Sequence, residues 1–230
     1  FDEEWAEMTK MEVGNRVWKA LYQQEPPIEN GEVFKREWFK YYKKAPEKFD
    51  SIMQTWDTTF KKTNSSDFCA GQVWGRVGCN YYLLKRIKQR MSFTDIQRAM
   101  LRLSVEFPNA RGKLVERKAN GEAIIDTMQD VVGGIIPVEC RDGKEIQARS
   151  VSPLFEAGNI YLPHPDIDNT IEEYVDEFCA FPNGTNDDEV DATCQYLNYD
   201  RNKNTIIIDK EIIEIGQQIK GLGDFLRSDI

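Results

Sequence analysis

Hydrophobic residues between positions 51 and 90 are gathered in three short runs. The runs at 51–60, 67–77 and 80–87 are rich in β-branched and aromatic residues, and turn-forming residues separate them: TNSS, and Gly78-Cys79-Asn80. Short runs of this composition between turn signals are typical of strands. We therefore expect three consecutive antiparallel strands.

After residue 91 the pattern changes to a helical period. Ser92 is a favourable N-cap residue, because its hydroxyl can accept a hydrogen bond from a backbone N–H of the first turn. Five apolar residues then recur at helical spacing on one stripe: Phe93, Ile96, Met100, Leu103 and Phe107. This spacing predicts an amphipathic helix.

Further along the chain, strands and helices alternate. The patterns predict strands at 113–118, 134–140 and 159–163, and helices at 120–132, 143–158, 169–181 and 186–199. Three meandering strands followed by this alternation indicate an α/β fold with a mixed central sheet. The order of elements resembles that of RNase H-like proteins, in which the centre of the sheet carries acidic residues.

We expect three regions along the sequence. Residues 1–50 have helical spacing up to about residue 24 and then a Pro/Gly/Asn loop, EPPIENGEVF, which indicates a connecting arm. Residues 51–200 form the RNase H-like domain, and 201–230 a C-terminal extension whose pattern is mixed. The first ten residues are acidic and lack a starting Met, so we expect the chain to begin inside a longer protein.

Composition excludes several classes of protein. Of the 230 residues, 40% are hydrophobic and 11% aromatic, which suffices for a folded core and rules out disorder and collagen. No apolar run approaches the ~20 residues needed to cross a bilayer, so a membrane protein is excluded. The five cysteines form no CxxC pair, which favours reduced thiols and a cytosolic compartment.

The residues that carry covalent and zinc chemistry are scarce. His164 is the single histidine, which argues against a Cys/His zinc site and against a nucleophile activated by histidine. The phosphate-binding motif GxxxxGK[ST] is absent as well. Hydrolytic chemistry in this chain would therefore rest on carboxylates and metal ions.

Charge is divided along the chain, although the net value is −9. Ten basic and three acidic residues lie between positions 81 and 120, whereas ten acidic residues and no basic residue lie between 161 and 191. A basic face beside an acidic pocket would suit phosphates and cations together. The alternative is that both segments are ordinary solvated surfaces.

Three acidic positions stand out. Asp57 lies inside the first β-rich run, and Glu116 follows Leu114 and Val115 on a short strand. Asp188 and Asp191 are three residues apart, so they share one face of the first turn of a helix. Each has a plain alternative: a solvent-facing strand acid, a salt bridge to a neighbouring base, and capping of the helix dipole.

Taken together, these positions favour a metal site. Carboxylates from two strands and one helix N-terminus can converge on two Mg²⁺ or Mn²⁺ ions, which are hard cations that prefer oxygen ligands. Two such metals can promote in-line displacement at a phosphodiester without histidine or a covalent nucleophile. The sequence therefore indicates a metal-dependent phosphodiesterase.

Five phrases in order along the chain carry a more specific resemblance. They are ALYQQEPPIENGEVFKREWF, QTWDTTFKKTNSSDFCAGQVWG, VERKANGEAIID, GKEIQARSVSPLFEAGNIYLP and FPNGTNDDEVDA. Together they resemble the C-terminal nuclease domain of the large terminase subunit of tailed bacteriophages, from about Ala20 to Tyr199. The resemblance implies an endonuclease that cuts concatemeric double-stranded viral DNA during genome packaging, in the cytoplasm of the infected bacterial host.

The resemblance also implies roles for individual residues. Asp57, Glu116, Asp188 and Asp191 would be the catalytic metal ligands, with Asp187 as a further ligand. Asp67 and Asn120 would support them, and Gly121 would let a helix begin close to the metals. For DNA backbone contacts we expect a basic set: Lys61, Lys62, Arg86, Lys88, Arg90, Arg117 and Lys118.

The expected partners are double-stranded DNA, the N-terminal ATPase of the same full-length protein, the portal and the small terminase subunit, with no membrane. Many relatives carry a histidine just before the paired acids, where Asn186 stands here. Two alternatives remain: another RNase H-like nuclease such as a junction resolvase, or a non-catalytic module that docks on DNA or the portal.

Overall fold

The computed structural model describes residues 5, 9, 31–58, 68–140 and 142–203. The chain divides into two compact units, Phe1–Tyr196 and Leu197–Ile230. The first unit holds every strand and helix named below. In the second unit the described residues, 197–203, are helical. Among the described residues, no helix combines the length and apolar character needed to cross a bilayer.

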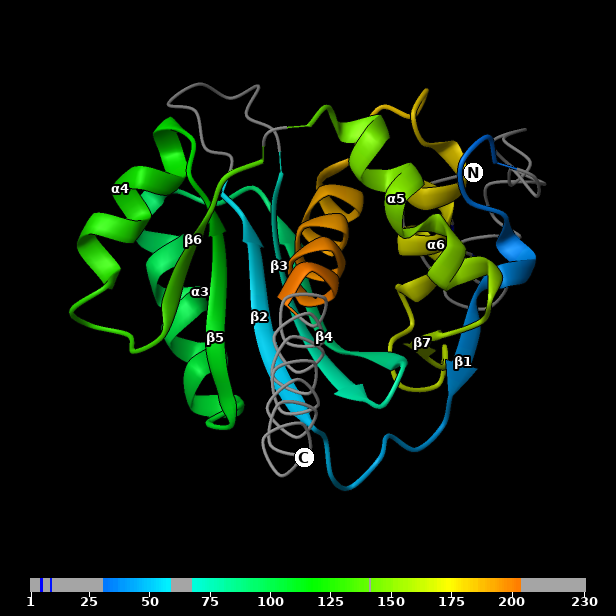
Figure 1. The fold of residues 1–230 in the computed structure, drawn as a ribbon, viewed down its shortest axis with the longest axis horizontal. Coiled ribbons are helices and arrows are strands. Elements are labelled where there is room, and N and C mark those ends of the chain that lie inside the picture. Colours follow the sequence, from blue (N-terminus) through cyan, green and yellow to red (C-terminus); the bar gives the residue numbers. More distant parts are fainter. Residues whose placement is uncertain (1–4, 6–8, 10–30, 59–67, 141, 204–230) are drawn as a thin grey trace, which may run out of the picture. The chain divides into compact units, whose positions relative to one another are not determined.

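A seven-stranded mixed sheet forms the centre of the first unit (Figure 1). Its spatial order is β1-β7-β4-β3-β2-β5-β6. The strands are β1 (Lys40–Tyr42), β2 (Ser51–Asp57), β3 (Cys69–Val77), β4 (Asn80–Gln89), β5 (Ala110–Glu116), β6 (Ile135–Val138) and β7 (Ile160–Pro163).

The pairing confirms the predicted fold class. Strands β2, β3 and β4 are consecutive and antiparallel, as their turn signals predict. Strand β5 then lies parallel to β2 on its other side, and β6 lies parallel to β5. The order β4-β3-β2-β5-β6 is the RNase H-like sheet, with three meandering strands followed by crossover connections.

The remaining two strands extend this sheet at the β4 side. Strand β7 runs parallel to β4 but pairs with it only at Tyr81 and Tyr82, and β1 pairs with β7 in parallel. The sequence analysis assigned no strand to residues 40–42, because three residues carry too short a pattern to show a period. The boundaries expected at residues 50 and 200 stay predictions.

Among the described residues, three α-helices connect successive strands: α3 (Phe93–Glu106), α4 (Ala119–Met128) and α5 (Lys144–Glu156). A further helix, α6 (Ile171–Ala180), follows β7, the last strand. The predicted cap of α3 is confirmed, because Ser92 accepts from the Asp95 N–H and the Asp95 carboxylate accepts from the Ser92 N–H. A short 3-10 helix, η1 (Arg36–Trp38), precedes β1. Residues 188–196 form a last helix of this unit, as predicted.

The helices cover the two faces of the sheet (Figure 1). On one face α3 and α4 pack over a core that includes Trp56, Val73 and Val115. On the other face the helix at 188–196 is held by buried hydrogen bonds rather than by apolar contacts alone. The Thr55 hydroxyl donates to the Ala192 carbonyl at 2.9 Å, and the Gln72 amide donates to the Glu189 carbonyl at 3.1 Å.

An aromatic cluster joins the segment before β1 to α5 and α6. Phe34 packs edge-on against Phe155 and Phe178, with ring centroids 4.8 and 4.9 Å apart. Phe39 contacts the same two rings. Such pairs contribute about 0.5–1.5 kcal/mol each beyond the area that they bury. Val33, Phe34 and Phe39 are thus part of the core of this unit.

Candidate active site

Two of the predicted acids end neighbouring strands. Asp57 is the last residue of β2 and Glu116 the last of β5, and the two strands are parallel with Trp56 opposite Val115. Side chains alternate between the faces of a sheet. Because Trp56 and Val115 lie in the core under α3 and α4, the alternation directs Asp57 and Glu116 to the opposite face, which carries the helix at 188–196.

The other predicted acids lie at the N-terminus of that helix. Asp188 and Asp191 belong to its first turn, and Asp187 immediately precedes it. The Asp188 side chain is largely buried. Cys69, at the start of β3, is affected by two of these acids. Burial, and then the charges of Asp57 and Asp188, raise the pKa of its thiol.

Lys118 extends from just beyond β5 into this group of acids. Its ammonium lies 2.8 Å from the Glu116 carboxylate. Burial lowers the pKa of Lys118, but the hydrogen bond to Glu116 and the charges of Glu116, Asp57 and Asp191 raise it overall. All three acidic elements of the predicted site, the ends of β2 and β5 and the helix N-terminus, therefore act on one lysine.

A second lysine, which belongs to α5, contacts two of the acids. Lys144 is the first residue of that helix, and its ammonium lies 2.7 Å from Asp187 and 2.5 Å from Asp191. These contacts outweigh burial and raise the pKa of Lys144 above its ordinary value. The sequence analysis did not place Lys144 among the acids, because 43 residues separate it from Asp187.

Burial raises the pKa of the helix acids. Burial and the charge of Glu177 raise the pKa of Asp188 to about 6, with Lys88 opposing them. Burial raises the pKa of Asp191 to about 6, although Lys144 lowers it. Acids that share a poorly solvated site resist ionisation unless a cation joins them. The arrangement thus favours occupation by positive charge.

Glu177 holds the helix that carries these acids, and the sequence analysis missed it. It lies on the buried face of α6, where its side chain is 4% exposed. One carboxylate oxygen accepts the Glu189 N–H at 2.7 Å, and the other pairs with the Lys88 ammonium. A carboxylate at a helix N-terminus satisfies free N–H groups and complements the helix dipole. A charged residue on the apolar face of a predicted helix was the available signal.

The cysteine beside Glu116 is no nucleophile. Burial and the neighbouring Glu116 carboxylate raise the pKa of Cys140 to about 12, so the thiol stays protonated near neutral pH. Only the thiolate is strongly nucleophilic. The candidate groups of this site are therefore its acids and lysines.

No three His, Cys, Asp or Glu side chains of the described residues are placed closely enough to hold one metal ion. Lysine ammonium groups lie among the acids instead. The donor set consists of carboxylate oxygens, which suit hard divalent cations. The ammonium groups mark where positive charge is accommodated, so the chemistry of these residues suits such a cation.

Comparison with known protein families gives one match, which begins within β2 and runs through the helix at 188–196. Residues 54–200 match the model of the terminase RNase H-like domain. The chain belongs to this family. No curated protein matches the sequence significantly.

Solved terminases share the fold of this domain. The large terminase of a thermophilic bacteriophage, in complex with ATP-γ-S, matches with a TM-score of 0.56 at 12% identity, over 86% of this chain and 52% of that one. The large terminase nuclease of the thermophilic phage G20c matches with a TM-score of 0.51 at 16% identity, over 72% and 96%. The chain thus spans about half the length of the terminase solved with ATP-γ-S.

A terminase from a virus of a different kind of host has the same fold. The human cytomegalovirus terminase nuclease domain, in a structure that was Mn soaked and inhibitor bound, matches with a TM-score of 0.50 at 11% identity. The match covers 70% of this chain and 92% of that one. At these identities the similarity concerns the fold.

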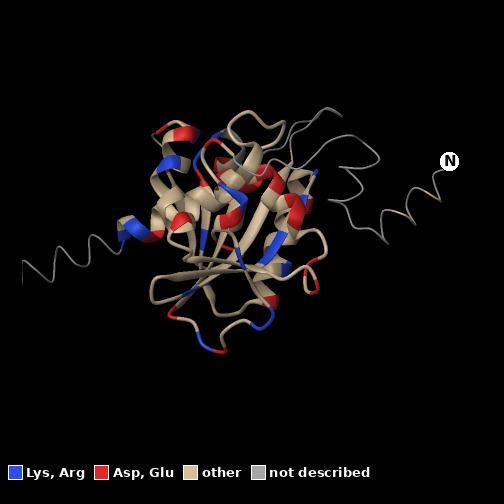
Figure 2. Ribbon diagram, turned by 90° about the vertical axis from the view of Figure 1, so that its right-hand side faces the viewer, with Lys and Arg blue, Asp and Glu red and all other residues tan. Residues whose placement is uncertain are grey.

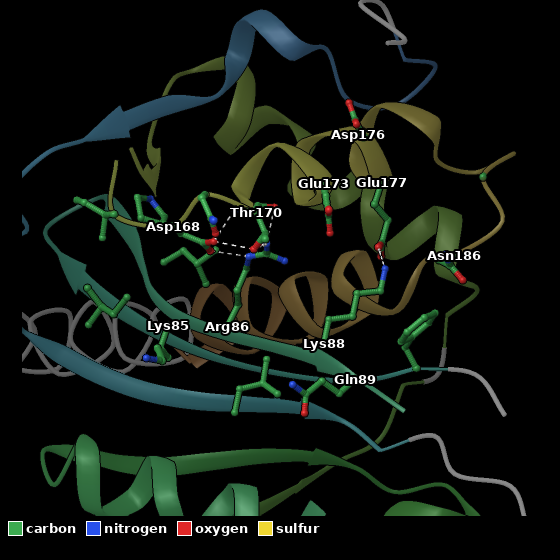
Figure 3. Close-up of a pocket in the computed structure, with 18 of the residues that line it drawn as sticks. Lys85, Arg86, Lys88, Gln89, Asp168, Thr170, Glu173, Asp176, Glu177 and Asn186 are labelled. Carbon is green, nitrogen blue, oxygen red and sulfur yellow. Dashed lines mark hydrogen bonds and ion pairs between the residues drawn. The ribbon is translucent and has the colours of Figure 1, made fainter. Parts of the chain in front are cut away.

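In this terminase domain, two of the basic residues predicted to contact DNA are engaged internally. Arg86 donates to Asp168 at 2.8 Å and to Glu189 at 2.9 Å, and its side chain is 8% exposed. Lys88 pairs with Glu177 (Figure 3). These pairs leave little of either cation available to bind a phosphate, so we do not expect Arg86 and Lys88 to contact DNA.

The other predicted residues are differently placed. The Arg90 guanidinium lies over the Phe68 ring at 4.9 Å, and Arg117 is half-exposed, 3.5 Å from Glu122. Asn120 lies in the first turn of α4, where only its backbone is described. Lys61, Lys62 and Asp67 lie outside the described residues, so their roles stay predictions.

Gly121 has the close approach expected of it. A Cβ at this position would overlap the carbonyl oxygen of Glu116 and reach within 3.3 Å of the Thr58 hydroxyl. Only glycine lets α4 begin this near to the end of β5. The glycine thus sets the position of the backbone that carries Glu116.

A groove of about 1120 Å³ runs between β4 and α6 and ends at Asn186, beside the helix acids (Figure 3). Its walls carry both signs of charge, including Lys85 and Arg102 on one side and Glu173 on the other. Acidic and basic segments also lie close together across the face shown in Figure 2. Ion pairs between distant segments, such as Arg36 with Glu172 at 2.9 Å, bring the two signs together.

Proposed function

We propose that this domain is the nuclease of a large terminase subunit, a metal-dependent endonuclease that cuts concatemeric double-stranded viral DNA during genome packaging. The observation that carries the proposal is the convergence of Asp57, Glu116 and Asp191 on Lys118 in a domain of the terminase family. Asp188 belongs to the same turn of helix as Asp191.

Asp57, Glu116, Asp188 and Asp191 would hold two Mg²⁺ or Mn²⁺ ions, with Asp187 beside them. Two bound ions of this kind supply an activated water and charge stabilisation for the leaving oxygen of a phosphodiester. The Mn-soaked cytomegalovirus nuclease domain supports divalent metal as the cofactor. The protein's own part is to fix the carboxylates: the strand ends hold Asp57 and Glu116, and Glu177 holds the turn that carries Asp188.

The remaining partners follow from the same proposal. Double-stranded DNA would approach the acids from the side on which Arg117 and Lys118 are exposed to solvent. The thermophilic phage terminase, about twice as long and solved with an ATP analogue, supports an ATPase as the other half of the full-length protein. The portal and the small terminase subunit complete the expected partners, in the cytoplasm of the infected bacterial host.

A plasmid-nicking assay with Mn²⁺, Mg²⁺ or EDTA tests this function. Asp57→Asn keeps the size of the side chain but removes a metal ligand, and we expect cutting to fall at least ~100-fold, since metal sites rarely tolerate loss of a ligand. Asp126→Asn makes the same change on the exposed face of α4 and should cut normally.

Intact plasmid in every metal, with folded wild-type protein, would contradict a self-sufficient nuclease. That result would favour the non-catalytic docking module, whose acids would serve to bind the internal lysines. Equal cutting by wild type and Asp57→Asn would show instead that cutting does not depend on Asp57, which would contradict its proposed role as a metal ligand.

A further inference from the structure

We propose that Lys144 is an internal counter-ion of this site, whose ammonium takes the place of a cation between Asp187 and Asp191 and must leave before metal binds. This inference rests on the proposed function, because it concerns the metal that the nuclease would use. By this contact, the first residue of α5 would lower the affinity of the site for metal.

The geometry of the contact carries the inference. The Lys144 ammonium lies 2.7 Å from an Asp187 oxygen and 2.5 Å from an Asp191 oxygen. The first contact is a charge-assisted hydrogen bond and the second an ion pair, so the ammonium bridges two carboxylates. Asp191 is also one of the acids that act on Lys118. A metal ion that used Asp191 would have to displace this bridge.

The position of Lys144 in its own helix points the same way. It is the first residue of α5, and its N-cap, Gly143, offers no side-chain cap. A cation at a helix N-terminus faces the positive end of the helix dipole, which is unfavourable. The two carboxylates compensate for this placement. Lys144 is therefore held by the acids rather than by its helix.

The side chain can also leave without disturbing the core. The side chain of Lys144 is 48% exposed, and those of Asp187 and Asp191 are 37% and 21% exposed. A lysine has a flexible stem and a strongly hydrated head, so it can move into water at small cost. We expect a divalent cation to replace the Lys144 ammonium at Asp191 and the Lys144 side chain to move into solvent.

Mn²⁺ binding in the absence of DNA, measured by isothermal titration calorimetry on the full chain, tests this directly. Lys144→Gln removes the competing charge, and we expect it to bind Mn²⁺ about tenfold more tightly than wild type, which corresponds to about 1.4 kcal/mol. Lys144→Arg keeps a cation and should bind within about twofold of wild type, since a factor of two is only about 0.4 kcal/mol.

Lys85→Gln is the matched control. Lys85 is equally exposed, at 47%, but it pairs with Glu106 of α3 at 3.2 Å, away from these acids. If its loss tightened Mn²⁺ binding as much as the loss of Lys144, net charge alone would be responsible and the inference would be wrong.

The outcomes separate this inference from the proposed function. Equal or weaker Mn²⁺ binding by folded Lys144→Gln, with clear binding by wild type, would overturn the counter-ion role and leave the nuclease standing. Absence of Mn²⁺ binding in both proteins would overturn both. In EDTA, Lys144→Gln should also unfold at a lower temperature than wild type, and Mn²⁺ should raise its unfolding temperature by more. A stability in EDTA unchanged by the substitution would contradict the bridge.

Discussion

Replacement of Glu177 tests how the helix acids are held in place. In Glu177→Ala, the Glu189 N–H loses its acceptor at 2.7 Å and Lys88 loses its partner. A hydrogen bond to a charged group contributes about 1.5–3 kcal/mol, and an anion at a helix N-terminus contributes about 0.3–1 kcal/mol. Lys88 can recover hydration, because its side chain is 19% exposed. We therefore expect a loss of about 2–4 kcal/mol in the free energy of unfolding.

Glu177→Gln separates charge from hydrogen bonding. Its amide oxygen can still accept the Glu189 N–H, so we expect a smaller loss of about 1–2 kcal/mol, from weaker pairing with Lys88 and the helix dipole. It also removes the negative charge that helps to raise the pKa of Asp188 to about 6. The pKa of Asp188 should therefore fall, which carboxyl ¹³C NMR titration in EDTA can follow.

Urea unfolding, followed by tryptophan fluorescence at constant pH in EDTA, measures the free-energy changes. Glu173→Gln, the same substitution on the exposed face of α6, should stay within about 0.5 kcal/mol of wild type. A Glu177→Ala protein as stable as wild type would refute the reasoning. An unchanged pKa of Asp188 in Glu177→Gln would refute the electrostatic part of it.

Two further predictions concern the same site. Gly121→Ala must push α4 away from the Glu116 carbonyl, so we expect urea unfolding to show a loss of about 1–3 kcal/mol in the free energy of unfolding. Gly133→Ala, with open space around it, is the control and should be neutral. Equal effects of the two substitutions would contradict the close approach. Asp188 has a folded-state pKa of about 6, above its ordinary value of 3.8, so its contribution to stability is full below about pH 4 and is lost as pH rises through about 6. In EDTA at about pH 7.5, Asp188→Asn should therefore be more stable than wild type by about 1–3 kcal/mol. At about pH 4 it should lose this advantage. The opposite order of stabilities in thermal unfolding would contradict the burial argument.

Much of the fold could be predicted because its signals are local. The three β-rich runs and their turns predict the antiparallel meander, and Ser92 with its apolar stripe predicts α3, including the cap. The alternation that follows predicts the crossover strands. Strand β1 escaped prediction because its three residues pair only with β7, which lies far along the chain at Ile160–Pro163.

The candidate site was partly predictable for the same reason. Asp57 and Glu116 stand out because each interrupts an apolar strand, and the local pattern also places Asp191 in the first turn of a helix. Their burial, pairing and pKa values depend on distant partners. Lys144 and Glu177 belong to other helices, and nothing near them in sequence indicates that they touch these acids.

The sequence by itself determined most of the strands and helices and which strands carry acids, because periodicity and capping depend on neighbours within a few residues. The tertiary structure decided how charge is distributed. The basic segment at 81–120 and the acidic segment at 161–191 are separate in sequence, yet Arg86 and Lys88 of the first pair with Asp168 and Glu177 of the second. Charges buried on folding require partners, and only the packing of β4 against α6 and its preceding loop determines which partners they find.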